Sequence, residues 1–171
     1  DFNTMGSEEI KRMYTEKSHG MDFSLIEGTK GLFDGISTDG ADSNAELADL
    51  LKSSVLLVID CEGITRGIAP LLEGYKSFGK KLKLNKVILN NVSTSRHESK
   101  LVSAISRYTD FRVLGVIPSI KNFIVERHLG LVPTFQHPQK KKVLSSLVAI
   151  IRNNTDYKKL FPLRSKSQKK V

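Results

Sequence analysis

The stretch from Leu25 to Gly35 combines two carboxylates and three glycines, a composition suited to holding a small charged ligand. The apolar run Phe23–Glu27 predicts a buried strand that ends at the Glu27 carboxylate. Glycines at positions 28, 31 and 35 let the backbone approach a ligand closely, and Asp34 adds a second carboxylate. A carboxylate at a strand end can hold Mg²⁺ against the phosphate oxygens of a nucleotide. The spacing alone is equally compatible with a glycine-rich turn whose two acidic side chains are only solvated and bind nothing.

Four apolar runs rich in β-branched residues predict the sheet that positions these groups: Phe23–Glu27, Val55–Asp60, Val87–Asn90 and Val113–Ile117. Because the runs are nearly continuous, we expect strands that are covered on both faces. Apolar residues at helical spacing predict helices at Met5–His19, Ala45–Leu51, Thr65–Phe78, Arg96–Tyr108 and Val143–Arg152. The first of these is expected to be capped near Asn3 or Thr4.

The alternation of strands and helices is typical of βαβ crossovers. It predicts an α/β fold with a mostly parallel sheet and helices on both faces. In such sheets ligands bind at the carboxyl ends of the strands, which places Glu27, Asp60 and Asn90 at the expected ligand-binding edge.

Length and composition indicate a single globular domain. The chain has 171 residues, of which 39% are hydrophobic and 26% are charged. No apolar run reaches the roughly 18–20 residues that a membrane span needs, so we expect a cytoplasmic protein without a membrane contact. The single cysteine, Cys61, excludes an internal disulfide and a cysteine-rich zinc site, and we expect it to be a small packed residue.

The net charge of +9 comes from the C-terminal segment. Residues 138–171 contain ten basic residues and one acidic residue, so residues 1–137 are neutral as a set. A nucleic-acid-binding face usually spreads Lys and Arg over folded elements and adds aromatic side chains for stacking. The charge distribution therefore does not favour a nucleic-acid partner.

Two signatures make the chain recognisable. Glu27–Gly35 matches the pattern Glu-Gly-x-x-Gly-Leu-(Phe/Tyr)-Asp-Gly, and Glu126–Pro133 reads Glu-Arg-His-Leu-Gly-Leu-Val-Pro. With them the chain resembles the ATP-binding amidoligase domain of the cobyrinic acid a,c-diamide synthase family, which has a dethiobiotin-synthetase-like P-loop fold. The likeness covers roughly residues 1–163 and includes the segments 43–51, 58–60, 74–78, 87–90, 96–97 and 113–118.

The resemblance implies that residues 1–135 are the C-terminal part of that amidoligase domain. Residues 136–163 would be a closing helix and a junction segment, and residues 164–171 a basic, disordered tail. The family's phosphate-binding loop, which lies near its N-terminus, and its glutamine amidotransferase domain are not in the sequence. Whether the phosphate loop is lost, cleaved off, encoded upstream or carried by another chain stays open at the level of sequence. The near match Gly74–Lys81 is rejected as a phosphate loop, because it follows a helix and Lys81 replaces the Mg²⁺-binding hydroxyl.

The resemblance also implies a reaction and its site. ATP and Mg²⁺ would activate a peripheral carboxylate of a corrinoid precursor as an acyl phosphate, which ammonia from a glutamine amidotransferase domain or chain then displaces. Glu27 corresponds to the metal-binding acid and Asp34 to a second acid beside the reacting groups. Nucleotide contacts are implied for Asn90, Gly28, Arg127 and His128, and substrate contacts for Ser43 and Asn44, where the family usually has Ser-Thr.

Several alternatives remain open at the level of sequence. The segments present do not discriminate cobyrinic or hydrogenobyrinic acid from Ni-sirohydrochlorin as the tetrapyrrole substrate. A degenerate, non-catalytic binding module of the same fold is a further reading, and a homodimer is left open. A partition-type ATPase fits poorly, because the pattern of Glu27–Gly35 is not found in that group.

Overall fold

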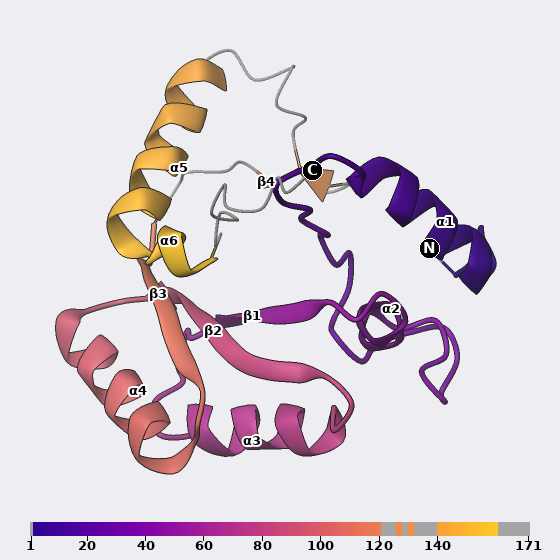
Figure 1. Cartoon of the computed structure of the whole chain (residues 1–171). Helices are drawn as coiled ribbons and strands as arrows, with labels where there is room; N and C mark the ends of the chain where they lie inside the picture. The colour runs from indigo at the N-terminus through magenta and orange to yellow at the C-terminus, as the bar shows by residue number, and fades with distance from the viewer. Residues whose placement is uncertain (1, 121–125, 128–129, 132–139, 161–171) are drawn as a thin grey trace, which may run out of the picture. The chain divides into compact units, whose positions relative to one another are not determined.

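The chain contains a three-stranded sheet, seen in a computed structural model that describes residues 2–120, 126–127, 130–131 and 140–160. The order of elements is α1 (Ser7–Ser18), α2 (Asn44–Leu50), β1 (Ser54–Asp60), α3 (Ile68–Phe78), β2 (Lys83–Val92), α4 (Ser95–Tyr108), β3 (Arg112–Pro118), β4 (Glu126–Arg127), β5 (Gly130–Leu131), α5 (Lys140–Asn154) and α6 (Tyr157–Leu160) (Figure 1). The strand order is β1-β2-β3, β2 and β3 run parallel, and β4 and β5 form a separate antiparallel pair. The predicted α/β class with a parallel sheet is confirmed.

The chain divides into two compact units, which are described separately. Asp1–Val55 and Gly74–Asn85 belong to the first unit, and Leu56–Glu73 and Lys86–Leu160 belong to the second. The glycine-rich loop with Glu27 is part of the first unit. The carboxyl ends of β1 and β2 are part of the second.

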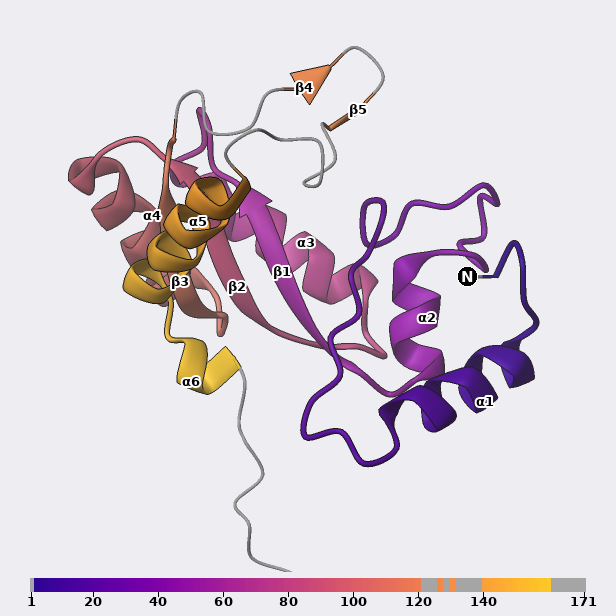
Figure 2. The same ribbon diagram turned by 90° about the horizontal axis from the view of Figure 1, so that it is seen from above.

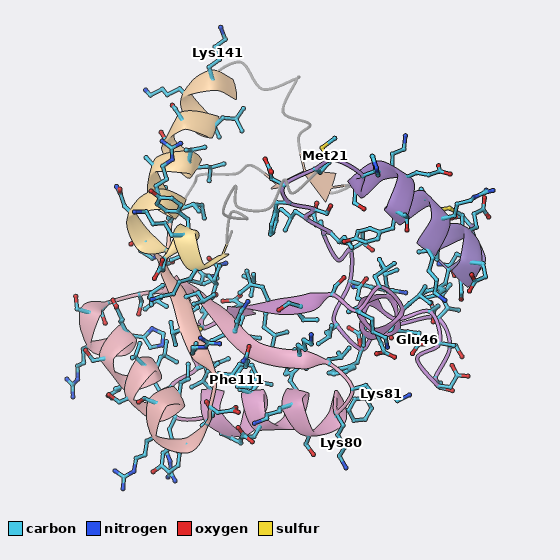
Figure 3. The ribbon with its side chains drawn as sticks, in the orientation of Figure 1. Met21, Glu46, Lys80, Lys81, Phe111 and Lys141 are labelled. Atoms are coloured by element: carbon cyan, nitrogen blue, oxygen red, sulfur yellow. The ribbon has the colours of Figure 1, made fainter. Side chains whose placement is uncertain are left out.

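The second unit has its core on both faces of β3 and of the adjoining part of β2. Helix α4 packs on one face of β3 and α5 on the other, as Figures 1 and 2 show, so the predicted helices on both faces are confirmed. Val87 and Leu89 of β2 are fully buried, and Phe111, labelled in Figure 3, is 5% exposed. Gly115 allows the close approach of the chain after α5, since a Cβ there would lie 2.6 Å from Thr155 Cγ2.

Helix boundaries follow from local capping. Thr94 caps α4 by accepting a hydrogen bond from the His97 N–H at 3.1 Å, and Ser43 caps α2 by accepting one from the Glu46 N–H at 3.2 Å. The predicted cap of α1 near Asn3 or Thr4 is wrong, because the N-cap is Gly6 and it makes no side-chain capping bond.

The predicted strand Phe23–Glu27 is not present. These residues have no regular secondary structure, and Leu25 and Ile26 are 75% and 42% exposed. A strand requires a hydrogen-bonded neighbour, and none of the described strands pairs with this segment. The prediction that every strand is covered on both faces is also wrong for β1, because its Val58 side chain is 60% exposed among the described residues.

Candidate functional site

The loop that holds both candidate acids is fastened by the residues at the start of α2. The Asn44 side-chain amide donates hydrogen bonds to the carbonyl oxygens of Lys30, at 2.7 Å, and Gly31, at 3.4 Å. A Cβ at Gly28 would lie 2.9 Å from Asn44 Nδ2, so only glycine lets the loop pass this close to Asn44. The structure thus brings together Gly28 and Asn44, two of the predicted binding residues.

Asp42 fastens the second half of the loop. Its carboxylate accepts hydrogen bonds from the backbone N–H groups of Ile36, at 2.9 Å, and Ser37, at 3.2 Å, and it forms an ion pair with Lys30 at 3.0 Å. These contacts lower the pKa of Asp42 to about 2, with the Ile36 N–H the largest cause and Lys30 the next. A Cβ at Gly35 would overlap the same carboxylate, which explains the glycine at this position.

An aromatic cluster holds the middle of the loop. The Phe33 ring lies 5.6 Å from the ring of Tyr75 and 4.9 Å, edge-on, from the ring of Phe78, measured between centroids. Gly79 follows directly, and a Cβ there would meet Phe33 and the Leu84 side chain at 3.0 and 2.8 Å. The segment from Gly74 to Lys81 therefore ends a helix and packs against Phe33, which agrees with its rejection as a phosphate loop.

The two acids themselves project from this framework. Glu27 is exposed, and within the described part of the chain its side chain makes no hydrogen bond or ion pair. Asp34 lies over the backbone of Gly31, where a Cβ would collide with its carboxylate, and its N–H donates to the Gly31 carbonyl at 3.2 Å. Both carboxylates thus belong to one short loop whose backbone is fixed from Asn44 and Asp42.

Ser43 is only 4% exposed, and both it and Asn44 have structural contacts in α2 and the loop. Their contact with substrate stays a prediction. The sequence reasoning missed Asp42 and Lys30, because the Asp42 carboxylate reaches backbone N–H groups five and six positions earlier and a lysine 12 positions earlier, and no local motif marks such contacts.

The second unit contains the remaining candidates. Asn90 lies near the end of β2 with an exposed side chain, and its carbonyl accepts the Cys61 N–H at 2.9 Å. Asp60 accepts the Glu62 N–H at 3.0 Å at the end of β1. Cys61 is fully buried, and burial raises the pKa of its thiol, in agreement with a packed residue.

The last two candidates lie in the second signature. Arg127 belongs to β4, whereas His128 lies outside the described residues. The roles implied for both remain predictions.

Titration of Asp42 is the first test of this loop. Because its folded pKa is depressed, its bonds stabilise the loop at pH values above its unfolded pKa, and this contribution is lost as the pH falls toward about 2. The backbone amide resonances of Ile36 and Ser37 should therefore shift with a midpoint near 2. The matching variant Asp42→Asn should remove this titration, and a midpoint close to the ordinary aspartate pKa of about 3.9 in the unaltered chain would contradict the bonding described.

The loop offers two carboxylates as metal ligands, those of Glu27 and Asp34, which suits a cation that takes few ligands from the protein. No group of three or more His, Cys, Asp or Glu side chains that could hold a metal lies among the described residues. Mg²⁺ is usually bound by one or two carboxylates together with phosphates and water, so the exposed Glu27 is compatible with it. None of the helices in the described ranges is long and apolar enough to cross a membrane.

Comparison with known proteins gives one family match and several similar proteins. The sequence profile of the AAA domain family matches residues 4–127. The chain is 38% identical over 160 residues to a cobyrinate a,c-diamide synthase of Magnetococcus marinus, covering 93% of this chain and 34% of that protein. It is 34% identical over 167 residues to the cobyrinate a,c-diamide synthase of Caldanaerobacter subterraneus, covering 97% of this chain and 37% of that protein.

An archaeal relative shows the same extent of likeness. The cobyrinate a,c-diamide synthase of Methanocaldococcus jannaschii is 38% identical over 149 residues, which cover 85% of this chain and 33% of that protein. The chain thus spans about a third of the length of the curated relatives it matches. No solved structure matches it at a significant level. The resemblance found in the sequence is confirmed, and the chain belongs to the AAA domain family, in which it is similar to one segment of the cobyrinate a,c-diamide synthases.

Proposed function

We propose that this chain is part of a ligase that uses ATP to amidate peripheral carboxylates of a corrinoid precursor, cobyrinic or hydrogenobyrinic acid. The observation that supports this most strongly is the similarity to cobyrinate a,c-diamide synthases along 85–97% of the chain. The fastened loop with two acids supports it chemically, because phosphoryl transfer between anions needs a bound cation, and carboxylates are the ligands that hold Mg²⁺.

The reaction explains why such groups are needed. A carboxylate does not react with ammonia, because an oxide ion is a very poor leaving group. Transfer of the terminal phosphoryl group of ATP to a carboxylate oxygen releases ADP and gives an acyl phosphate. Ammonia then adds to the carbonyl carbon, phosphate leaves with the C–O bond electrons, and the loss of a proton from nitrogen leaves the amide.

The residues of this chain have separate parts in the proposal. Glu27 would hold Mg²⁺, which supplies charge neutralisation between ATP and the substrate when it is bound. Asp34, on the same loop, would orient the metal or the substrate carboxylate. Asn90, Gly28, Arg127 and His128 would contact the nucleotide, and Ser43 and Asn44 the substrate side of the loop.

The proposed reaction also implies a source of ammonia, and the proposal includes a cell compartment and a division of the chain into segments. Ammonia would come from a glutamine amidotransferase domain or chain, and the protein would act in the cytoplasm. Residues 1–135 would belong to the amidoligase domain, 136–163 to the domain junction and 164–171 to a basic tail. The related amidation of Ni-sirohydrochlorin and a non-catalytic binding module remain the other candidates.

The test is an assay of the complete gene product with Mg²⁺, ATP, glutamine and either cobyrinic acid or Ni-sirohydrochlorin. We expect ADP, phosphate and glutamate to form in step with an amidated tetrapyrrole detected by mass spectrometry. If the enzyme amidates Ni-sirohydrochlorin and not cobyrinic acid, the proposed corrinoid substrate is wrong and Ni-sirohydrochlorin takes its place. Tetrapyrrole or nucleotide binding without turnover of either substrate would identify a binding module and overturn the ligase.

A further inference from the structure

A pocket of about 410 Å³ lies within the second unit, between the segment after β1 and the beginning of α4. Its lining consists of Thr65, from the first segment, and four residues of the second: Thr94, Arg96, His97 and Lys100. Both segments follow the carboxyl ends of parallel strands, the edge at which α/β sheets bind their ligands. None of the roles assigned to Glu27, Asp34 or Asn90 uses this pocket.

His97 ties the two walls of the pocket together. Its Nε2 lies 2.5 Å from the carbonyl oxygen of Ile64, which is 33 positions earlier in the sequence. Its Nδ1 lies 3.3 Å from the backbone nitrogen and 3.1 Å from Oγ of Ser93. Because a backbone N–H can only donate, Nδ1 is the acceptor, and the ring proton therefore resides on Nε2 and is donated to Ile64.

The charged side chains in the described lining, those of Arg96 and Lys100, are both positive. Arg96 and Lys100 lie one turn apart on α4, and neither takes part in the ion pairs found in the described ranges. None of the described residues that line the pocket is a carboxylate. The Thr94 oxygen already accepts the His97 N–H, so its hydroxyl proton is available to a ligand.

The neighbouring charges are engaged elsewhere or lie outside the lining. The guanidinium of Arg66 lies 5.2 Å from the centre of the Tyr108 ring, as a cation–π contact. Glu98, in the first turn of α4, is exposed and is not a lining residue. Among the described residues the pocket therefore offers two cations and hydroxyl donors, and no acidic side chain in its lining opposes them.

We propose that this pocket binds an anionic group, a phosphate or a carboxylate, through Arg96 and Lys100, with His97 as the residue that holds the two walls in place. An arginine fork matches both kinds of oxyanion, and lysine adds a point charge. Since both cations are exposed to water, the affinity for a simple ion is expected to be in the millimolar range. The site is distinct from the proposed metal loop and does not depend on the ligase reaction.

The test is an NMR titration of the ¹⁵N-labelled 171-residue chain at constant ionic strength, first with inorganic phosphate and then with the tricarboxylate tricarballylate. Saturable shifts should appear at the amides of Thr65, Thr94 and Lys100. The double variant R96Q/K100Q should weaken binding by about tenfold or more. The charge-matched control K141Q/K142Q, on the exposed side chains of α5, should bind as the unaltered chain does; Lys141 is labelled in Figure 3.

The outcomes separate the possibilities. Tighter binding of phosphate than of tricarballylate would identify a phosphoryl group as the ligand, and the reverse order a carboxylate; either result supports the site. Equal weakening in both double variants would show non-specific attraction to a basic chain and overturn the proposal. Absence of saturable shifts with both anions, in a chain whose spectrum remains dispersed, would overturn it as well.

Discussion

Replacing Glu27 by alanine is expected to lower the rate of tetrapyrrole amidation by the complete gene product about a thousandfold or more, without loss of folded protein. A metal-binding carboxylate contributes several kcal/mol to transition-state stabilisation, and each 1.4 kcal/mol corresponds to about a factor of ten in rate. The fold should persist because the Glu27 side chain is exposed and bonds to none of the described residues. Steady-state kinetics at saturating ATP and circular dichroism measure the two effects.

Two further variants show whether the charge of Glu27 is responsible. Glu27→Gln keeps the size and polarity of the side chain but removes its charge, so it should be nearly as inactive as Glu27→Ala. Glu16→Ala removes an equally exposed glutamate from α1 and should leave turnover unchanged. Turnover of the Gln variant close to that of the unaltered enzyme would remove Glu27 from the metal site.

Truncation of Leu89 to alanine should cause a large loss of stability. Leu89 is 0% exposed, in the central strand β2, where it pairs with Val116 of β3. Removing a buried leucine side chain leaves a cavity and costs about 2–5 kcal/mol in the free energy of unfolding. Urea denaturation of the 171-residue chain, followed by circular dichroism, measures this change.

The same substitution at Leu25 is the matched control. Leu25 is 75% exposed, so Leu25→Ala should change the free energy of unfolding by no more than about 0.5 kcal/mol. A loss of about 2 kcal/mol or more for Leu25→Ala would show that the apolar segment before Glu27 is buried in solution and would contradict this prediction.

The regular elements were predictable because their signals are local. The β-branched runs at β1, β2 and β3 are nearly continuous, and the apolar stripe of α4 repeats about every 3.6 residues, so each signal lies within one segment. The segment Phe23–Glu27 has the same composition as these strands and yet is not one. Strand formation depends on a neighbour, and composition within five residues contains no information on whether that neighbour is there.

The candidate site was predictable in part. The carboxylates of Glu27 and Asp34 and the nearby glycines were found from residue types and from the resemblance to a family. The ion pair that holds this loop in place was not predicted. Asp42 lies 12 residues from its partner Lys30, and its effect on the loop depends on three contacts that no spacing rule encodes.

The order of residues alone thus determined the kind of elements, their sequence along the chain and the family to which the chain belongs, because each of these is recorded in short stretches of neighbouring residues. Tertiary structure decided which side chains meet across loops. The Lys30–Asp42 ion pair and the His97 bridge to Ile64 join segments 12 and 33 positions apart. Such contacts depend on the path of the backbone between their ends, and that path is set by the packing of the whole unit.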